Sequence, residues 1–240
     1  LHHDSYWPEG SLVLEAGCGV GAQTRIICPQ NPGCQFVAVD FARKSLAQAR
    51  DTCAQLGIDN VTFTEADVYA LPLADQSVDH VFVCFLLEHL HDVPDALREL
   101  IRVLKKGGTL TVIEGDHGSA YFHPDSAAAQ KVIAAQVLLQ RQQGGDPNIG
   151  RRLYPLLSAS GLQEVTVEPR QVYADDSSPR LVEGFIKNTF TAMIKGITEE
   201  AIAHQLLTKE EMDRGLADLQ KTGEGGGSFC YTFFKATTTK

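Results

Sequence analysis

Carboxylates recur in the first part of the chain at places where apolar runs end. Glu15 lies in the segment 13–21, which reads as an apolar strand, then Gly-x-Gly-x-Gly, then the start of a helix. Asp40 ends the next apolar run, and Asp67 follows the third. Glycines let the backbone turn sharply and approach a ligand, and carboxylates accept hydrogen bonds from hydroxyl, amino and ammonium groups. The pattern predicts a binding site for a small polar ligand.

The position of Glu15 distinguishes between two ligands that use such a loop. Gly17, Gly19 and Ala22 also fit the looser dinucleotide pattern G-x-G-x-x-A. A dinucleotide places its pyrophosphate over this loop, where a carboxylate would repel it. S-adenosylmethionine has no phosphate, and its ammonium and sulfonium groups are attracted to an acidic loop. The sequence therefore favours S-adenosylmethionine over NAD.

The other two acids and one aromatic residue complete the expected contacts with a nucleoside. Asp40 is placed to accept hydrogen bonds from both ribose hydroxyls, and Asp67 from the adenine amino group. Phe41, next to Asp40, is expected to pack on the adenine ring. Because the three acids stand at successive strand ends, in order along the chain, they predict a cofactor site more strongly than any one of them alone.

The elements that must position these acids alternate between strand and helix. Strands are expected at 12–15, 36–39, 61–63, 78–85 and 109–113, and helices at 21–28, 43–56 and 92–106, the last ended by Gly107. Alternating strands and helices imply a parallel, doubly wound sheet. Ligands of such sheets bind beyond the carboxyl ends of the strands, which is where the acids stand.

The second half of the chain has a different pattern. Helices are expected at 124–143, 151–160 and across 179–221, and strands at 165–167 and 229–235. The helical stretch before the last strand is expected to cap the ligand face. The alanine-rich helix 126–143 is expected to pack as core or as a dimer surface, which leaves a homodimer possible.

The first half resembles the class I S-adenosylmethionine-dependent methyltransferases, especially those similar to the ubiquinone and menaquinone biosynthesis methyltransferases. The resemblance extends from Ser11 to about Asp116. It rests on V-L-E-A-G-C-G-V-G, F-V-A-V-D, E-A-D-V-Y-A-L-P-L-A-D-Q-S-V-D-H-V and L-K-K-G-G-T-L-T-V-I-E. It implies an α/β, Rossmann-like, doubly wound sheet of seven strands, mostly parallel with an antiparallel last strand, and helical cap insertions.

The resemblance also implies a domain plan and a set of contacts. The plan is one domain over 1–240, with a cofactor-binding core at 11–116, cap helices and remaining core at 117–222, and the last strand at 227–236. In the family, the acid and glycines of the first motif hold the methionine part, and a segment after the fourth strand passes beside the cofactor. The predicted cofactor-binding residues are Glu15, Gly17, Cys18, Gly19, Gly21, Asp40, Phe41, Asp67, Val68, Phe85 and Leu86.

Residues after the fifth expected strand are the candidates for catalysis. Methyl transfer from a sulfonium is an in-line displacement, in which the protein aligns donor and acceptor and excludes water. An acceptor that carries a proton also needs a base, and His117 is the first choice, with Glu114 and Asp116 beside it. The alternative is that Asp116 and His117 only shape a turn before Gly118.

Candidate substrate residues come from the expected cap and the helix after it. Arg151 and Arg152 could bind a substrate carboxylate through a bidentate fork, or could be a solvated pair. Asn188 is a further candidate without a decisive signal. The predicted substrate residues are Tyr121, His123, Arg151, Arg152, Tyr154 and Tyr173.

Other chemistries find less support in the sequence. Glu88, His89, His91 and His117 could suggest a metal site, but their spacing is loose and no C-x-x-C pair supports them, so no metal is expected. Cys84-Phe-Leu-Leu stands where enzymes that methylate exocyclic amino groups of DNA have Asn-Pro-Pro-Tyr. The absence of that pattern removes this class.

Composition limits the partners and the compartment. The net charge is −9, and no cluster of lysine and arginine offers a surface for phosphates, so nucleic acid is not an expected substrate. No apolar run approaches the ~20 residues that span a bilayer, so no membrane association is expected. The six cysteines form no C-x-x-C pair and indicate free thiols in a reducing cytoplasm.

Four functions remain open at this point. The leading hypothesis is a methyltransferase that uses S-adenosylmethionine and acts on a small molecule. The second is an enzyme of the same fold that uses the aminobutyryl arm of the cofactor, for example a cyclase that forms azetidine-2-carboxylate. The third is a non-catalytic cofactor-binding module. A NAD-dependent dehydrogenase is the weakest hypothesis, because of Glu15.

Overall fold

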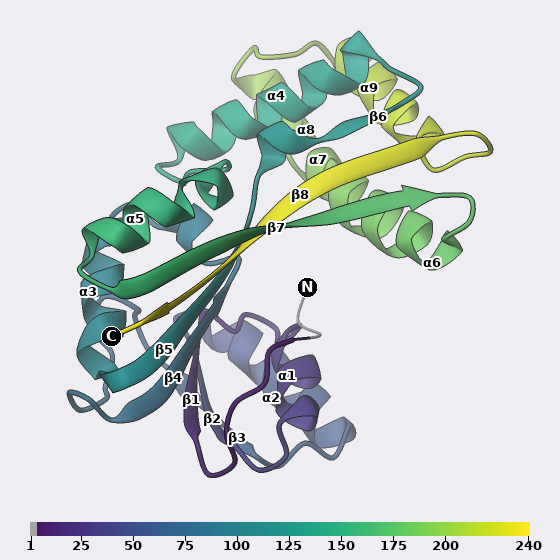
Figure 1. Ribbon diagram of the computed structural model, residues 1–240. Helices are drawn as coiled ribbons and strands as arrows, with labels where there is room; N and C mark the ends of the chain where they lie inside the picture. Colours follow the sequence, from purple (N-terminus) through teal and green to yellow (C-terminus); the bar gives the residue numbers. More distant parts are fainter. Residues whose placement is uncertain (1–3) are drawn as a thin grey trace. The chain divides into compact units, whose positions relative to one another are not determined.

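The computed structural model describes residues 4–240, and the chain forms two compact units (Figure 1). Unit 1 contains Glu114 and the described residues before it, together with 150–168 and 234–240. Unit 2 contains 115–149 and 169–233. The predicted core 11–116 thus falls in unit 1 except for its last two residues, whereas 150–168 leaves the expected cap and joins unit 1. A single domain over 1–240 stays a prediction.

Five strands of unit 1 follow the predicted order of a doubly wound sheet. They are β1 (Leu12–Ala16), β2 (Gln35–Asp40), β3 (Val61–Glu65), β4 (Val78–Cys84) and β5 (Leu104–Gly115). Their order across the sheet is β3-β2-β1-β4-β5, and the pairs are parallel. Most residues of β1 and β4 are apolar and buried, because parallel strands in such a sheet are covered on both faces.

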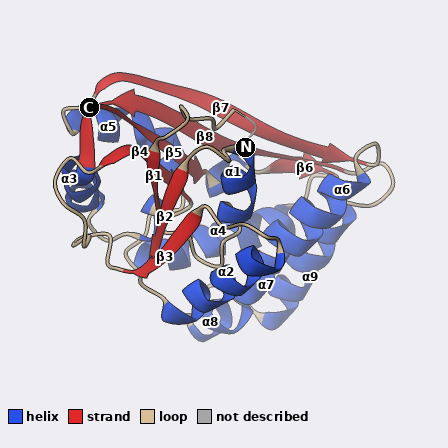
Figure 2. Ribbon diagram, turned by 90° about the horizontal axis from the view of Figure 1, so that it is seen from below, coloured by secondary structure: helices blue, strands red, loops and turns tan. Residues whose placement is uncertain are grey.

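The helices of unit 1 bury apolar stripes against this sheet. They are α1 (Thr24–Gln30), α2 (Arg43–Gln55), α3 (Val93–Val103) and α5 (Leu153–Ala159). Figure 2 shows α1 and α2 on one side of the strands, and α3 and α5 on the other. The start of α3 is fixed by Asp92, whose side chain accepts a hydrogen bond from the backbone N–H of Asp95 at 2.9 Å.

Two predicted boundaries near β5 are wrong. The helix α3 ends at Val103 and not at Gly107, because residues 104–108 already belong to the strand. Leu104 pairs with Val78, and the Lys105 ammonium lies 2.7 Å from the Asp79 carboxylate instead of at the end of the helix. The paired glycines indicated a helix end, but they lie within the extended chain.

The last strands confirm the predicted mixed sheet and add to it. The strand β8 (Ser228–Thr239) lies between β5 and β6 in the sheet order, and β6 (Tyr121–His123) pairs with it in antiparallel fashion. The strand β7 (Gln163–Asp175) pairs with β8 as well, and it extends well beyond the predicted 165–167. The sheet has eight strands and not seven because the short β6, which carries no clear alternation, adds to the predicted set.

Unit 2 contains the helices of the second half other than α5. They are α4 (Ala127–Gln142), α6 (Pro179–Leu181), the π-helix η4 (Val182–Thr191), α7 (Ala192–Gly196), α8 (Thr198–Ala203) and α9 (Lys209–Lys221). The helices α4 and α9 approach closely at Gly215, where an added Cβ would lie 2.4 Å from a methyl group of Val132. Aromatic rings of η4 and β8 pack together, with Phe190 and Phe229 at a centroid distance of 4.8 Å.

Two further observations concern the whole described chain. Among residues 4–240, none of the helices combines the length and the apolar composition that a membrane span requires. The six cysteines are free thiols, and all except the half-buried Cys230 are buried, in agreement with the prediction.

Candidate cofactor site

All eleven predicted cofactor-binding residues lie in unit 1, around the carboxyl ends of β1 to β4. The loop after β1 turns back over the end of β2, and the backbone N–H groups of Gly17 and Cys18 both donate to the Val39 carbonyl oxygen, at 2.9 and 3.0 Å. Gly17 has a φ of 76°. An added Cβ on Gly17 would lie 2.8 Å from Cδ1 of Leu86. The glycine loop and the segment after β4 are therefore in contact.

This contact leads to a prediction for stability. Gly17→Ala should lower the free energy of unfolding by about 2 kcal/mol, because the side chain is strained at this φ and also displaces Leu86. Denaturant unfolding measures the loss. Gly57→Ala is the matched control, since Gly57 has a φ of 68° and no atom within 4 Å of an added Cβ. Equal losses in the two variants would contradict a tight contact at Leu86.

Glu15 lies behind the glycine loop and not on an exposed rim. Its side chain is buried, and one carboxylate oxygen accepts a hydrogen bond from the Thr24 hydroxyl at 2.7 Å. Burial raises the pKa of Glu15 to about 7, and the Thr24 hydroxyl partly opposes this rise. The acid is therefore only partly ionised at neutral pH, and a positive charge brought to the loop would favour its ionised form.

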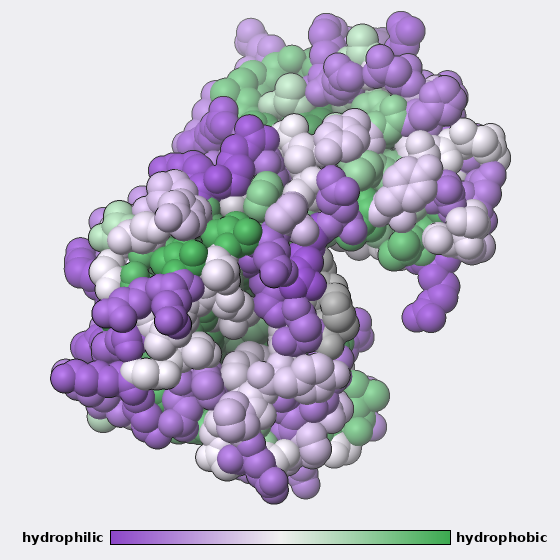
Figure 3. Space-filling view, viewed as in Figure 1, coloured by the Kyte–Doolittle hydropathy of each residue, from purple (hydrophilic) through white to green (hydrophobic). Residues whose placement is uncertain are grey.

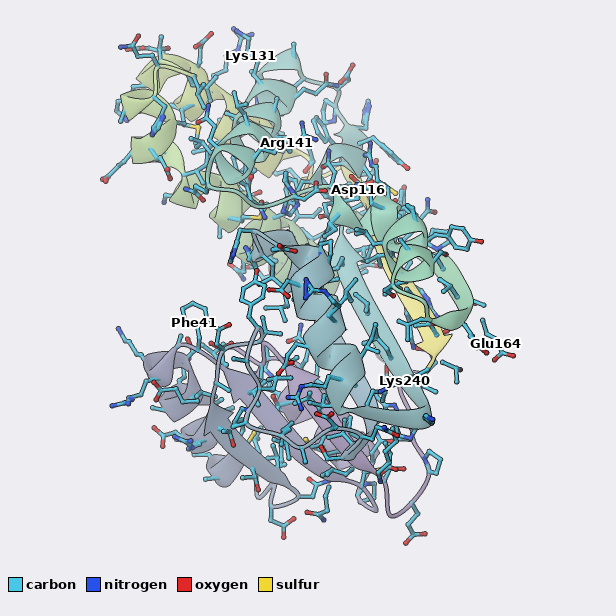
Figure 4. The ribbon with its side chains drawn as sticks, turned by 90° about the vertical axis from the view of Figure 1, so that its left-hand side faces the viewer. Phe41, Asp116, Lys131, Arg141, Glu164 and Lys240 are labelled. Atoms are coloured by element: carbon cyan, nitrogen blue, oxygen red, sulfur yellow. The ribbon has the colours of Figure 1, made fainter. Side chains whose placement is uncertain are left out.

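Asp40 joins the glycine loop to the start of α2. One carboxylate oxygen accepts from the backbone N–H of Gly19 at 2.8 Å, and the other accepts from that of Ala42 at 2.9 Å. Each oxygen retains a lone pair for a further donor. Phe41 follows with its side chain 79 % exposed, and Figure 4 shows it at the surface of unit 1.

The loop after β3 is held by its own contacts. The carboxylate of Asp67, an exposed residue, accepts from the backbone N–H of Tyr69 at 3.0 Å, and Val68 is buried beside it. The Tyr69 hydroxyl lies 3.1 Å from Nδ1 of His91. These contacts fix the loop that carries Asp67 to the loop after β4.

Glu114 at the end of β5 holds the segment after β4. The side chain is completely buried, and its Oε1 accepts from the backbone N–H groups of Leu86 and Leu87 at 3.0 and 2.7 Å. Burial, together with the nearby carboxylate of Glu88, raises its pKa well above the usual range. Phe85, which precedes this segment, has a φ of 57°, a strained value outside glycine. These contacts give Glu114 a positioning role at the predicted cofactor segment.

His117 lies in unit 2, in a 3-10 turn that spans His117–Ser119. This turn is the one expected if Asp116 and His117 shape the chain before Gly118. The backbone oxygen of buried Asp116 accepts a hydrogen bond from the N–H of Ser119 at 2.9 Å. The imidazole has a partner of its own, because its Nδ1 lies 2.7 Å from the hydroxyl oxygen of buried Tyr231. His117 therefore belongs to a turn and also has an imidazole whose orientation is fixed by Tyr231.

The predicted substrate residues do not gather in one unit. Arg151, Arg152 and Tyr154 are exposed in unit 1, and Arg152 lines a cavity of about 520 Å³ between α3 and α5. Tyr121, His123 and Tyr173 are exposed in unit 2. Asn188 is also in unit 2, where its amide donates to the Glu183 carboxylate at 3.3 Å.

Sequence reasoning missed three residues that organise these sites. Thr24 is the partner of Glu15, and a hydroxyl in the first turn after a glycine loop is a signal that could have found it. Arg102 holds the loop that follows Asp67, because its guanidinium donates to the carbonyl oxygens of Leu71 and Leu73 at 3.1 and 2.9 Å. Tyr231 is far from His117 in the chain, so no local pattern indicates their contact.

The candidate metal residues do not form a site in the described part of the chain. Glu88 and His89 approach each other at 3.7 Å. Among residues 4–240, no group of three or more histidine, cysteine, aspartate or glutamate side chains is arranged to hold a metal ion.

Proteins with similar sequences are named as methyltransferases, which agrees with the arrangement of glycines and acids in unit 1. A family model described as a methyltransferase domain matches residues 14–112. A demethylmenaquinone methyltransferase of Thermus thermophilus is 38 % identical over 102 residues, which cover 42 % of this chain and 46 % of that protein. Residues 14–112 of this chain form a domain of the methyltransferase family. The match with this chain covers about half or less of the length of the first curated relatives.

Solved structures resemble this methyltransferase over nearly its whole length. A putative methyltransferase of Bacillus halodurans is 17 % identical, with a TM-score of 0.62, and the match covers 97 % of this chain and 94 % of that one. The [4+2]-cyclase SpnF is 20 % identical, with a TM-score of 0.60, and the match covers 97 % of this chain and 76 % of that one. At such identities the likeness shows the fold alone.

Proposed function

We propose that this methyltransferase binds S-adenosylmethionine in unit 1 and transfers its methyl group to a small molecule by in-line displacement. One observation carries the proposal: the carboxylate of Asp40 joins the glycine loop to α2, while Glu15 lies behind the same loop. Acids at both places suit a positively charged nucleoside and oppose a diphosphate.

Each part of the site has a role in this proposal. Asp40 accepts from the ribose hydroxyls through its remaining lone pairs, and Phe41 packs on the adenine. Glu15 favours the positive methionine end through the buried charge behind the loop. Glu114 keeps the backbone after β4 in place beside the cofactor, because its carboxyl group fixes two consecutive amides.

The transfer itself needs few groups. S-adenosylmethionine supplies a methyl group on a sulfonium, which the acceptor's lone pair attacks as the C–S bond breaks toward sulfur. His117 takes the proton of a protic acceptor. The contact between Nδ1 and the Tyr231 hydroxyl oxygen orients the imidazole, and in the tautomer that carries its hydrogen on Nδ1 the lone pair on Nε2 is the base.

Phe41 offers a test of the adenine contact that does not disturb the fold. Phe41→Ala should weaken the binding of S-adenosylhomocysteine by about five- to tenfold, since a stacked ring contributes about 1 kcal/mol. The melting temperature should not change, because the side chain is 79 % exposed. Leu56→Ala, which truncates another exposed side chain of unit 1, is the control and should leave the affinity unchanged. Unchanged affinity in Phe41→Ala would place the adenine elsewhere.

The reaction class is decided by the product. The protein is incubated with labelled S-adenosylmethionine and metabolite extracts, and the cofactor product is identified by mass spectrometry. S-adenosylhomocysteine that forms only when extract is present supports methyl transfer. Methylthioadenosine released without extract would contradict it and would favour the cyclase reaction that forms azetidine-2-carboxylate. Binding without any turnover would favour a non-catalytic module.

A further inference from the structure

The helix α4 carries a second apolar stripe that is buried at Ile133 and becomes exposed toward Ala134 and Leu138. Its first stripe packs on α9, around the contact of Val132 with Gly215. The second stripe runs through Ile133, Ala134, Val137 and Leu138, at the spacing of one helix face. Leu138 is 42 % exposed, and it lies beside exposed Ala134 and half-buried Val137, so the stripe presents a group of neighbouring apolar side chains and not a single one.

This second stripe forms one wall of a cavity of about 450 Å³ within unit 2. His117, Gly118 and Ala120 also line this cavity. The volume falls in the range of about 300 to 1,000 Å³ that is typical of small-molecule sites. Figure 3 shows hydrophobic surface beside α4, next to hydrophilic residues.

A cation stands at one end of the stripe. Arg141 lines the cavity in the last turn of α4, and Figure 4 shows it on this helix, with Lys131 nearer to the N-terminal end. Lys131 is paired with Glu211 at 2.8 Å, whereas Arg141 has no carboxylate at ion-pair distance among residues 4–240. Arg141 is exposed, so its guanidinium is accessible to the carboxylate of a ligand that lies on the stripe.

We propose that this cavity binds an amphipathic carboxylic acid, with its hydrocarbon part on the α4 stripe and its carboxylate on Arg141. Arg141 thereby takes the anion-binding role that the sequence suggested for Arg151 and Arg152, which lie in unit 1.

The test compares two probes that differ only in their head group, octanoate and 1-octanol, by calorimetric titration of the full chain. The protein should bind octanoate about tenfold more tightly than octanol, as expected for one charge-assisted, partly exposed contact. Arg141→Gln should abolish this preference, Arg141→Lys should keep most of it, and Leu138→Ser should weaken both probes. Lys131→Gln, the same change on the same helix, should have no effect.

Three results would overturn the proposal: neither probe binds, Arg141→Gln keeps the preference for octanoate, or Lys131→Gln removes it equally. Failure of the proposed function is distinguishable, because S-adenosylhomocysteine is titrated separately in every variant. Loss of cofactor binding in the unchanged chain with octanoate binding intact would reject the methyltransferase activity but not the acid-binding cavity. The Arg141 variants should bind S-adenosylhomocysteine as the unchanged chain does.

Discussion

A chain with Glu15→Gln is expected to bind S-adenosylmethionine about ten- to a hundredfold more weakly than the unchanged protein at pH 8. The reason is the loss of a buried negative charge behind the loop, where a charge-assisted interaction contributes about 1.5 to 3 kcal/mol. In the unchanged protein, affinity should rise with pH through about 7 and then level off, because a bound cation favours ionised Glu15. Titrations from pH 6 to 8.5 measure both effects, and Glu15→Gln should flatten the profile.

The same substitution should stabilise the empty protein at high pH. The folded pKa of about 7 lies above the ordinary value of 4.5, so the fold resists ionisation of Glu15. Stability is therefore lost as the pH rises from 4.5 toward 7 and stays lost above it. Glu15→Gln removes this cost and should raise the free energy of unfolding by up to about 3 kcal/mol at pH 8, and by little at pH 4.

Asp79→Asn is the control, because it should change the free energy of unfolding in the opposite direction. The Asp79 carboxylate lies at the other end of β1, where it accepts from the backbone N–H of Leu12 and pairs with Lys105. These partners lower its pKa, so its contribution to stability is present above the ordinary pKa and is lost as the pH falls. Asp79→Asn should destabilise the protein at neutral pH and leave the affinity unchanged. If Glu15→Gln gained stability without losing affinity for S-adenosylmethionine, Glu15 would have no role in binding the cofactor.

Asp40→Asn should weaken the binding of S-adenosylhomocysteine by about a hundredfold. The amide has one acceptor oxygen where the carboxylate has two, so either Gly19 or Ala42 loses its partner and the ribose loses a charged acceptor. The ribose contact is isolated with the 2′-deoxyribose analogue of the ligand. The unchanged protein should prefer the ribose form about tenfold, and Asp40→Asn should show no preference.

The control for Asp40→Asn is Asp51→Asn, which makes the same change on the exposed face of α2. It should affect neither the affinity nor the preference between the two ligands. If Asp40→Asn still preferred the ribose form, Asp40 would be a structural support of the loop and not a ligand for the ribose.

The order of the strands was predictable because it depends on local patterns. Apolar runs locate β1 to β4 within a few residues, and the spacing of Leu46, Ala49 and Cys53 locates α2. The carboxyl ends of parallel strands share one edge, so the positions of the acids followed from the strand order alone.

Contacts between residues far apart in the chain, and the burial of individual side chains, could not be predicted from the sequence. Glu15 reads as a surface carboxylate in the motif, but its orientation toward Thr24 depends on how α1 packs behind the loop. The short β6 exists only because β8 pairs with it, and Tyr231 reaches His117 across 114 positions of sequence. Helix and strand periods are local signals and carry no information about such pairs.

We propose that the acidic glycine loop selects a cationic nucleoside over a dinucleotide. Calorimetric titration of the full chain with S-adenosylmethionine and with NADH at pH 8 measures this selectivity. We expect saturable binding of S-adenosylmethionine, no measurable binding of NADH, and a smaller difference between the two ligands in Glu15→Gln. Binding of NADH with equal or higher affinity in the unchanged protein would contradict it.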